Sequence, residues 1–112
     1  MRALRKLTLS MALTLGALSS SLAYASSGTS TGRIVTMLWY EGHTGLLVQT
    51  ETMSDLGGCG RSDYYILDET HPYFKEMYAL ILSAHFADQP LSLSIQDCSQ
   101  GISRIRHVQS AR

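Results

Sequence analysis

One stretch in the second half of the chain limits what the protein can fold into: a nearly continuous apolar segment, a proline, and a strictly alternating segment. The apolar segment, residues 72–87, predicts a helix in which Lys75, Glu76 and Ser83 are the clearly polar residues. The helix must end before Pro90, because proline and the residue preceding it disfavour helical backbone. A helix with so little polar surface needs apolar partners on more than one side.

Five shorter segments around this helix predict β-strands, because they are rich in β-branched and aromatic residues or alternate between apolar and polar positions. They are residues 32–40, 46–52, 63–68, 91–98 and 102–108. Three strands, a helix and two strands form the element order of a mainly β, five-stranded OB-like barrel, in which the helix between the third and fourth strands closes one end. The rival arrangement is an α+β sandwich with the helix lying across an open sheet.

The start of the chain, residues 1–25, has the three parts of a secretory signal peptide: a basic end, a short apolar run and a small-x-small cleavage site. The alternatives are an uncleaved anchor or a buried first helix, although the apolar run is too short to span a membrane. Cleavage after Ala25 would leave residues 26–31 as a flexible lead-in and residues 32–112 as a single OB-like domain. We therefore expect a protein exported to the periplasm or secreted, with no transmembrane segment in its mature part.

Both cysteines, Cys59 and Cys98, lie in the part of the chain that would be exported. An even number of cysteines in a small exported domain favours a disulfide. That bond would contribute roughly 4 kcal/mol in a chain-entropy model. Two free thiols or half of a metal site are the alternatives. Because the four histidines are scattered without ligand spacing, we expect neither a metal nor a cofactor.

Charge and motifs argue against two further classes of function. Without the signal peptide, six basic residues face nine acidic ones, a net charge of −3, whereas nucleic-acid binding needs a basic surface. Arg104 and Arg106 form the only local basic pair, which a strand edge would explain. Ser62, Asp63 and His71 could be combined as a catalytic triad, but no nucleophile elbow surrounds them. We therefore expect a non-catalytic protein.

Two segments of the mature chain, TGRIVTMLWYEGHTG from Thr31 and FKEMYALILSAHFADQPLSLSI from Phe74, resemble the B subunits of subtilase cytotoxin and its pertussis-like relatives. The matching features are the glycine that opens the first strand, the helix pattern Phe-x-x-Met-Tyr-x-x-Ile, and Gln-Pro before an alternating strand. The resemblance implies a secreted OB-fold protein that forms a ring pentamer, binds sialylated host glycans and associates with a toxin A subunit.

The same resemblance implies a glycan site at the start of the first strand. In those toxin subunits a serine just before the strand glycine contacts the sialic acid, and Thr31 occupies that position here, with Ser30 beside it. Arg33 is the nearest cation and would pair with a sialic acid carboxylate. A tyrosine that lines the pocket in the toxin subunits has no aromatic counterpart here, since the matching region is Ile95-Gln96.

The apolar helix also predicts a homo-oligomer. One face of the helix fits the 3.6-residue period and would cover the barrel, whereas Leu80 and Leu82 fall elsewhere on the helical wheel and would face a partner subunit. Together these features favour a secreted or periplasmic glycan-binding subunit. The alternative is a solitary periplasmic domain that binds or inhibits a protein partner.

Overall fold

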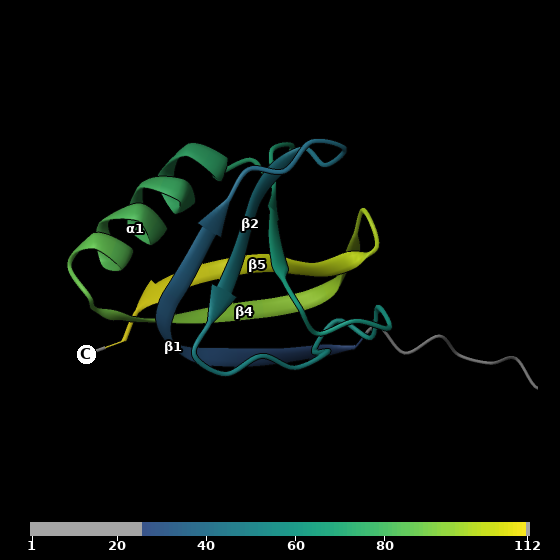
Figure 1. The fold of residues 1–112 in the computed structure, drawn as a ribbon, viewed down its shortest axis with the longest axis horizontal. Helices are drawn as coiled ribbons and strands as arrows, with labels where there is room; N and C mark the ends of the chain where they lie inside the picture. The colour runs from purple at the N-terminus through teal and green to yellow at the C-terminus, as the bar shows by residue number, and fades with distance from the viewer. Residues whose placement is uncertain (1–25, 112) are drawn as a thin grey trace, which may run out of the picture.

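The computed structural model describes residues 26–111, and Figure 1 shows how their elements are arranged. The predicted order of three strands, one helix and two strands is confirmed. The elements are β1 (Ser27–Leu38), β2 (Gly45–Thr50), β3 (Tyr65–Asp68), α1 (Phe74–Phe86), β4 (Pro90–Ser99) and β5 (Ile102–Ser110). The predicted signal peptide, residues 1–25, lies outside the described residues.

The five strands form one closed sheet. Their order is β1-β2-β3-β5-β4, and β4 pairs back onto β1. Neighbouring strands are antiparallel except β3 and β5, which run parallel. A closed, mainly β sheet with its helix between β3 and β4 confirms the OB-like prediction over the open sandwich.

β1 begins earlier than predicted, which corrects the expectation of a flexible lead-in at residues 26–31. Its first half, from Ser27 to Arg33, pairs with β4, and its second half, from Ile34, pairs with β2. A register shift between Ile34 and Thr36 separates the two halves, so one bent strand serves two neighbours. The first half is rich in hydroxyl side chains and has no clear strand pattern in its sequence. Its strand conformation therefore depends on pairing with β4.

The main core fills the inside of the closed sheet and continues under α1, which packs on β1 and β5 at one end of the barrel (Figure 1). The helix contributes Met77, Ile81 and Ala84, which are its buried residues. The strands contribute Ile34, Leu46, Val48, Tyr65, Leu67, Leu91, Leu93, Ile95 and Ile105. In the described part of the chain, no helix has both the length and the apolar character needed to cross a membrane.

The predicted disulfide between Cys59 and Cys98 is present, with Cα atoms 5.9 Å apart. It ties the glycine-rich loop between β2 and β3 to the end of β4. Gly57 is buried in this loop, and a Cβ added there would lie 2.3 Å from the carbonyl oxygen of Asp97. The close approach of loop and strand therefore requires a glycine.

Candidate functional site

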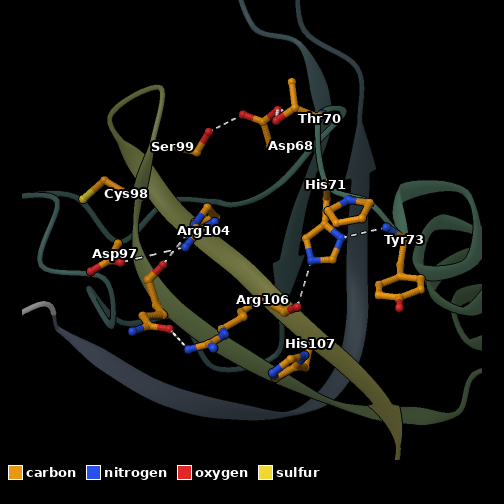
Figure 2. Close-up of a pocket in the computed structure, with 12 residues that line it drawn as sticks. Asp68, Thr70, His71, Tyr73, Asp97, Cys98, Ser99, Arg104, Arg106 and His107 are labelled. Atoms are coloured by element: carbon orange, nitrogen blue, oxygen red, sulfur yellow. Dashed lines mark hydrogen bonds and ion pairs between the residues drawn. The ribbon is translucent and has the colours of Figure 1, made fainter.

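A groove of about 780 Å³ opens where the loop between β3 and α1 meets the β4–β5 hairpin (Figure 2). We call it the polar groove, because most of its lining side chains are charged or hydrogen-bonding. It is lined by Asp68, Thr70, His71, Pro72, Tyr73, Gln96, Asp97, Cys98, Ser99, Arg104, Arg106 and His107. The parallel pairing of β3 with β5 brings these residues together, since it places the end of β3 beside the last strand.

Asp68 fixes one end of the groove. Its carboxylate accepts hydrogen bonds from the hydroxyl of Ser99, from the backbone N–H of Thr70 at 2.9 Å and from the Thr70 hydroxyl at 2.7 Å. Partial burial raises the pKa of Asp68, but these hydrogen bonds, with one from Gln100, outweigh it and lower the pKa to about 2. Asp68 is therefore a structural anion whose lone pairs are already occupied, and not a catalytic acid.

His71 fastens the wall of the groove to β5. Its Nδ1 accepts a hydrogen bond of 3.0 Å from the backbone N–H of Tyr73, so its Nε2 must carry the proton. That Nε2–H donates to the backbone carbonyl of Arg106 at 3.0 Å. The imidazole thus joins the start of α1 to β5, and both of its nitrogens are used within the fold.

The two arginines of the groove differ in how far their charge is compensated. Arg104 lies 3.8 Å from the carboxylate of Asp97 and donates to the backbone carbonyl of Gln96. The exposed Arg106 donates through Nη1 to the side-chain oxygen of Gln96, and no carboxylate of the described residues forms an ion pair with it. Figure 2 places Arg106 away from Asp68, beside His107. The groove therefore has a guanidinium available to an anion.

The groove continues onto the outer face of the sheet. A shallower hollow of about 280 Å³ shares Gln96, Arg106 and His107 with it and extends to Ser27, Gly28, Thr29, Ser94 and Ile95. The strand register places Thr29 opposite Ser94, and Ser94 opposite His107. Hydroxyl and imidazole groups thus form a row beside the free guanidinium.

Ser30 and Thr31, both predicted to bind glycan, point to opposite sides of β1. Ser30 is buried, and its hydroxyl shares a 3.1 Å hydrogen bond with the hydroxyl of Thr50. Thr31 is exposed on the outer face, where its hydroxyl donates to that of Ser92 at 3.3 Å. Of these two residues, only Thr31 presents its hydroxyl on the surface that also carries Thr29.

Arg33, the predicted partner of a sugar carboxylate, is also exposed on β1, but its charge is already compensated. Its guanidinium lies 3.6 Å from the carboxylate of Glu51 and 3.3 Å from that of Asp88. An anionic ligand at this position would have to compete with two carboxylates. The uncompensated guanidinium is instead that of Arg106, which the sequence indicated only as part of a basic pair.

The residues predicted for the oligomer interface, Leu80 and Leu82, are both half-buried in the described chain. Leu80 packs against the main core, whereas Leu82 belongs to neither hydrophobic cluster. The large hydrophobic side chains that are exposed are Val35, Trp39, Tyr40, Tyr73 and Phe86.

The other candidates for chemistry do not come together. Asp63 and His71 line different pockets. Within residues 26–111, no group of three or more His, Cys, Asp or Glu side chains could hold a metal ion. Comparison of the chain with known proteins finds no matching family model, no matching curated protein and no matching solved structure.

Proposed function

We propose that this protein is an exported, non-catalytic domain that binds an anionic glycan, of the sialylated class, in the polar groove. The observation that carries the proposal is the exposed guanidinium of Arg106, which has no ion-pair partner among residues 26–111. Gln96 holds its Nη1, so the remaining N–H groups are free to contact a carboxylate. A guanidinium recognises a planar carboxylate through paired hydrogen bonds, which makes it suited to an acidic sugar.

The surroundings of Arg106 support a sugar as the carrier of that carboxylate. The row formed by Thr29, Ser94 and His107 offers hydrogen bonds of the kind that sugar hydroxyls make. Tyr73 lines the groove and is 63% exposed, so its ring offers a flat apolar surface for a pyranose face. The volume of about 780 Å³ lies within the range of known ligand sites.

Export and assembly are part of the same proposal. The disulfide between Cys59 and Cys98 is of the kind that persists in oxidising compartments. The resemblance to toxin B subunits supports a ring-shaped homo-oligomer, a pentamer in that family, with a toxin A subunit as a further partner. The exposed rings of Trp39 and Phe86 supply apolar surface that such contacts would cover.

Isothermal titration calorimetry of the mature protein with 3′-sialyllactose, and with lactose as the uncharged control, tests the proposal. We expect wild-type protein to bind sialyllactose more tightly than lactose, and Arg106→Ala to weaken sialyllactose binding at least roughly tenfold, since a charged hydrogen bond is lost. Arg33→Ala is the matched control, because that guanidinium is already paired. If Arg106→Ala binds sialyllactose as tightly as the wild type, the polar groove is not the binding site. If a glycan array shows no sialylated ligand for the wild type, the proposed function is contradicted.

The alternative is a solitary domain that binds or inhibits a protein partner. The observation in its favour is the same exposed aromatic surface, with Phe86 80% exposed and Trp39 56% exposed. The mass of the native particle separates the two functions. A ring oligomer supports the glycan-binding subunit, whereas a monomer at micromolar concentration together with a negative glycan array would leave the protein-binding domain.

A further inference from the structure

A second pocket, of about 270 Å³, lies on another part of the barrel, where the loop between β1 and β2 meets the start of β5. We call it the loop pocket. Its floor is formed by Leu38, Leu47 and Ile102. These side chains belong to a small hydrophobic cluster, separate from the main core, in which Leu47 and Ile102 are almost fully buried. The floor is therefore apolar and firmly supported.

The walls of the loop pocket are aromatic. Tyr40 is 59% exposed, and its ring lies 6.1 Å from that of His43 at an angle of 52°. Tyr64 forms another wall and packs against the small cluster. The Nδ1 atom of His43 is buried, and no residue in the described part of the chain gives it a hydrogen bond.

The rim of the loop pocket carries an ion pair that is complete in itself. The Nε and Nη2 atoms of Arg61 donate to the two carboxylate oxygens of Asp63 at 2.6 and 2.5 Å. The hydrogen bond from Arg61 holds the pKa of Asp63 below its usual range, so the carboxylate stays charged at neutral pH. Arg61 keeps N–H groups that can donate further hydrogen bonds, and Asp63 keeps lone pairs that can accept them, while the pair as a whole carries no net charge. This chemistry suits neutral hydroxyl groups, whereas the uncompensated Arg106 of the polar groove suits an anion.

The loops around the loop pocket are held in place before any ligand arrives. Gln100, in the turn between β4 and β5, accepts a 2.9 Å hydrogen bond from the backbone N–H of Thr44 and donates one of 2.7 Å to its carbonyl. Gln49 donates to the backbone carbonyl of Asp63 at 2.9 Å. Such preorganisation lowers the entropic cost of binding.

We infer that the loop pocket is a second sugar site, which takes a single neutral pyranose ring. The apolar face of the ring lies against Tyr40 and Tyr64, and its hydroxyls bond to the pair formed by Arg61 and Asp63. The volume of about 270 Å³ is about a third of that of the polar groove, so the loop pocket suits a smaller ligand than the groove does. The inference rests on the proposed glycan-binding function, since it names a second class of sugar that the same protein would hold.

Titration of the ¹⁵N-labelled mature protein, followed by amide chemical shifts, tests the inference. The probes are methyl β-D-galactopyranoside and methyl β-D-glucopyranoside, and 3′-sialyllactose is titrated separately. We expect at least one of the neutral glycosides to shift amides of residues 40–44 and 61–64, and sialyllactose to shift amides of residues 104–107. Tyr40→Ala should weaken neutral glycoside binding roughly fivefold to tenfold, as expected for the loss of an aromatic contact.

Two further variants make the result specific. Phe86→Ala removes an exposed aromatic ring that lines neither the polar groove nor the loop pocket, and it should leave neutral glycoside binding unchanged. Tyr64→Phe keeps the ring that packs on the small cluster, so any change in glycoside binding by this variant comes from the loss of the hydroxyl and not from lost packing. If Tyr40→Ala binds the glycoside like the wild type, the loop pocket is not its site and the inference is overturned.

The outcomes for the two sugar classes are separable. If sialyllactose shifts the groove and neither neutral glycoside shifts the loop pocket, the inference fails and the proposed function stands. If a neutral glycoside shifts the loop pocket and sialyllactose shifts nothing, the second site is supported and the anionic site fails. If no sugar shifts any amide, both are overturned.

Discussion

The two ends of the barrel are closed by different means. At one end, α1 covers the core with three buried side chains, among them the fully buried Ile81. At the other end, the loop of residues 51–64 packs the half-buried Met53 and Leu56 against the main core, and a disulfide between Cys59 and Cys98 holds the loop to β4. A glycine-rich loop loses much conformational entropy on ordering, and its apolar side chains are less deeply buried than those of α1, so a covalent cross-link adds to the hydrophobic contacts.

Because the two ends depend on different interactions, they should respond to different perturbations. Reducing conditions should loosen the loop end and leave the helix end, whereas a cavity under α1 should do the reverse. The polar groove runs between the two ends, since its lining includes Cys98 at one and Tyr73 at the other. Four sets of variants test whether the two ends depend on different interactions.

Replacement of both cysteines, Cys59→Ala with Cys98→Ala, should lower the free energy of unfolding by roughly 4 kcal/mol, since the unfolded chain regains the entropy of a long loop. Urea denaturation of the oxidised wild type and the double variant measures the difference. A reductant should lower the wild type to the level of the variant and leave the variant unchanged. A loss below about 1 kcal/mol would mean that hydrogen bonds, such as the two that Asp55 accepts from the backbone of Cys59 and Gly60, hold the loop without the cross-link.

Ile81→Ala should lower the free energy of unfolding by about 3 kcal/mol, because it opens a cavity at the helix end of the core. Leu82→Ala, at a half-buried position outside both clusters, is the matched control and should cost less than half as much. If the two ends are energetically independent, the effect of Ile81→Ala should add to that of the cysteine replacements. A combined loss that departs clearly from the sum, measured by the same denaturation, would show that the two ends are coupled.

Asp68→Asn should lower the free energy of unfolding by roughly 1 kcal/mol at neutral pH, after allowance for the partial exposure of this side chain. The folded pKa of about 2 lies below the ordinary value, so the stabilisation is present above about pH 4 and is lost as the pH falls toward the folded pKa. Denaturation of wild type and variant across this range should show the two curves converging toward pH 2. A constant difference would mean that Asp68 stabilises the fold independently of its charge.

Leu82→Glu should change the free energy of unfolding of a single subunit least, by about 0.5 kcal/mol or less, because the position is outside both clusters. Its effect should be on assembly, since a charge cannot be buried unpaired in a subunit contact. Sedimentation should show the wild type as an oligomer and the variant as a folded monomer. Leu80→Glu is less selective, because Leu80 also packs on the core. A wild type that is already monomeric would contradict the assembly through α1.

The sequence predicted the parts of the fold that have a local pattern. The alternation of Leu91, Leu93 and Ile95 identifies β4, and all three are buried. The apolar run of α1 is equally clear. The first half of β1 has no such pattern, because residues such as Thr29 and Thr31 owe their strand conformation to pairing with β4 across most of the chain.

The polar groove was not predictable as a site, although one sign of it was present. Asp68 and His71 come from the middle of the chain, and Arg104 and Arg106 from its end. Only the parallel pairing of β3 with β5 places these groups together, and no spacing in the sequence encodes that pairing. The basic pair was visible in the sequence, but the partner that neutralises Arg104 and the absence of one for Arg106 among residues 26–111 depend on the fold.

The disulfide also shapes the path by which the barrel closes. Pairing of Ser27 with Gln96 joins segments from opposite ends of the domain, and contacts so distant in sequence slow folding because the chain must first search for them. Once Cys59 is joined to Cys98, the route along the chain between those two partners is roughly half as long, which lowers the entropic cost of closure by about 0.6 kcal/mol. Formation of the disulfide before the barrel closes would therefore speed the pairing of β1 with β4 up to roughly threefold. The redox conditions of the compartment would then affect the folding rate of the protein as well as its stability.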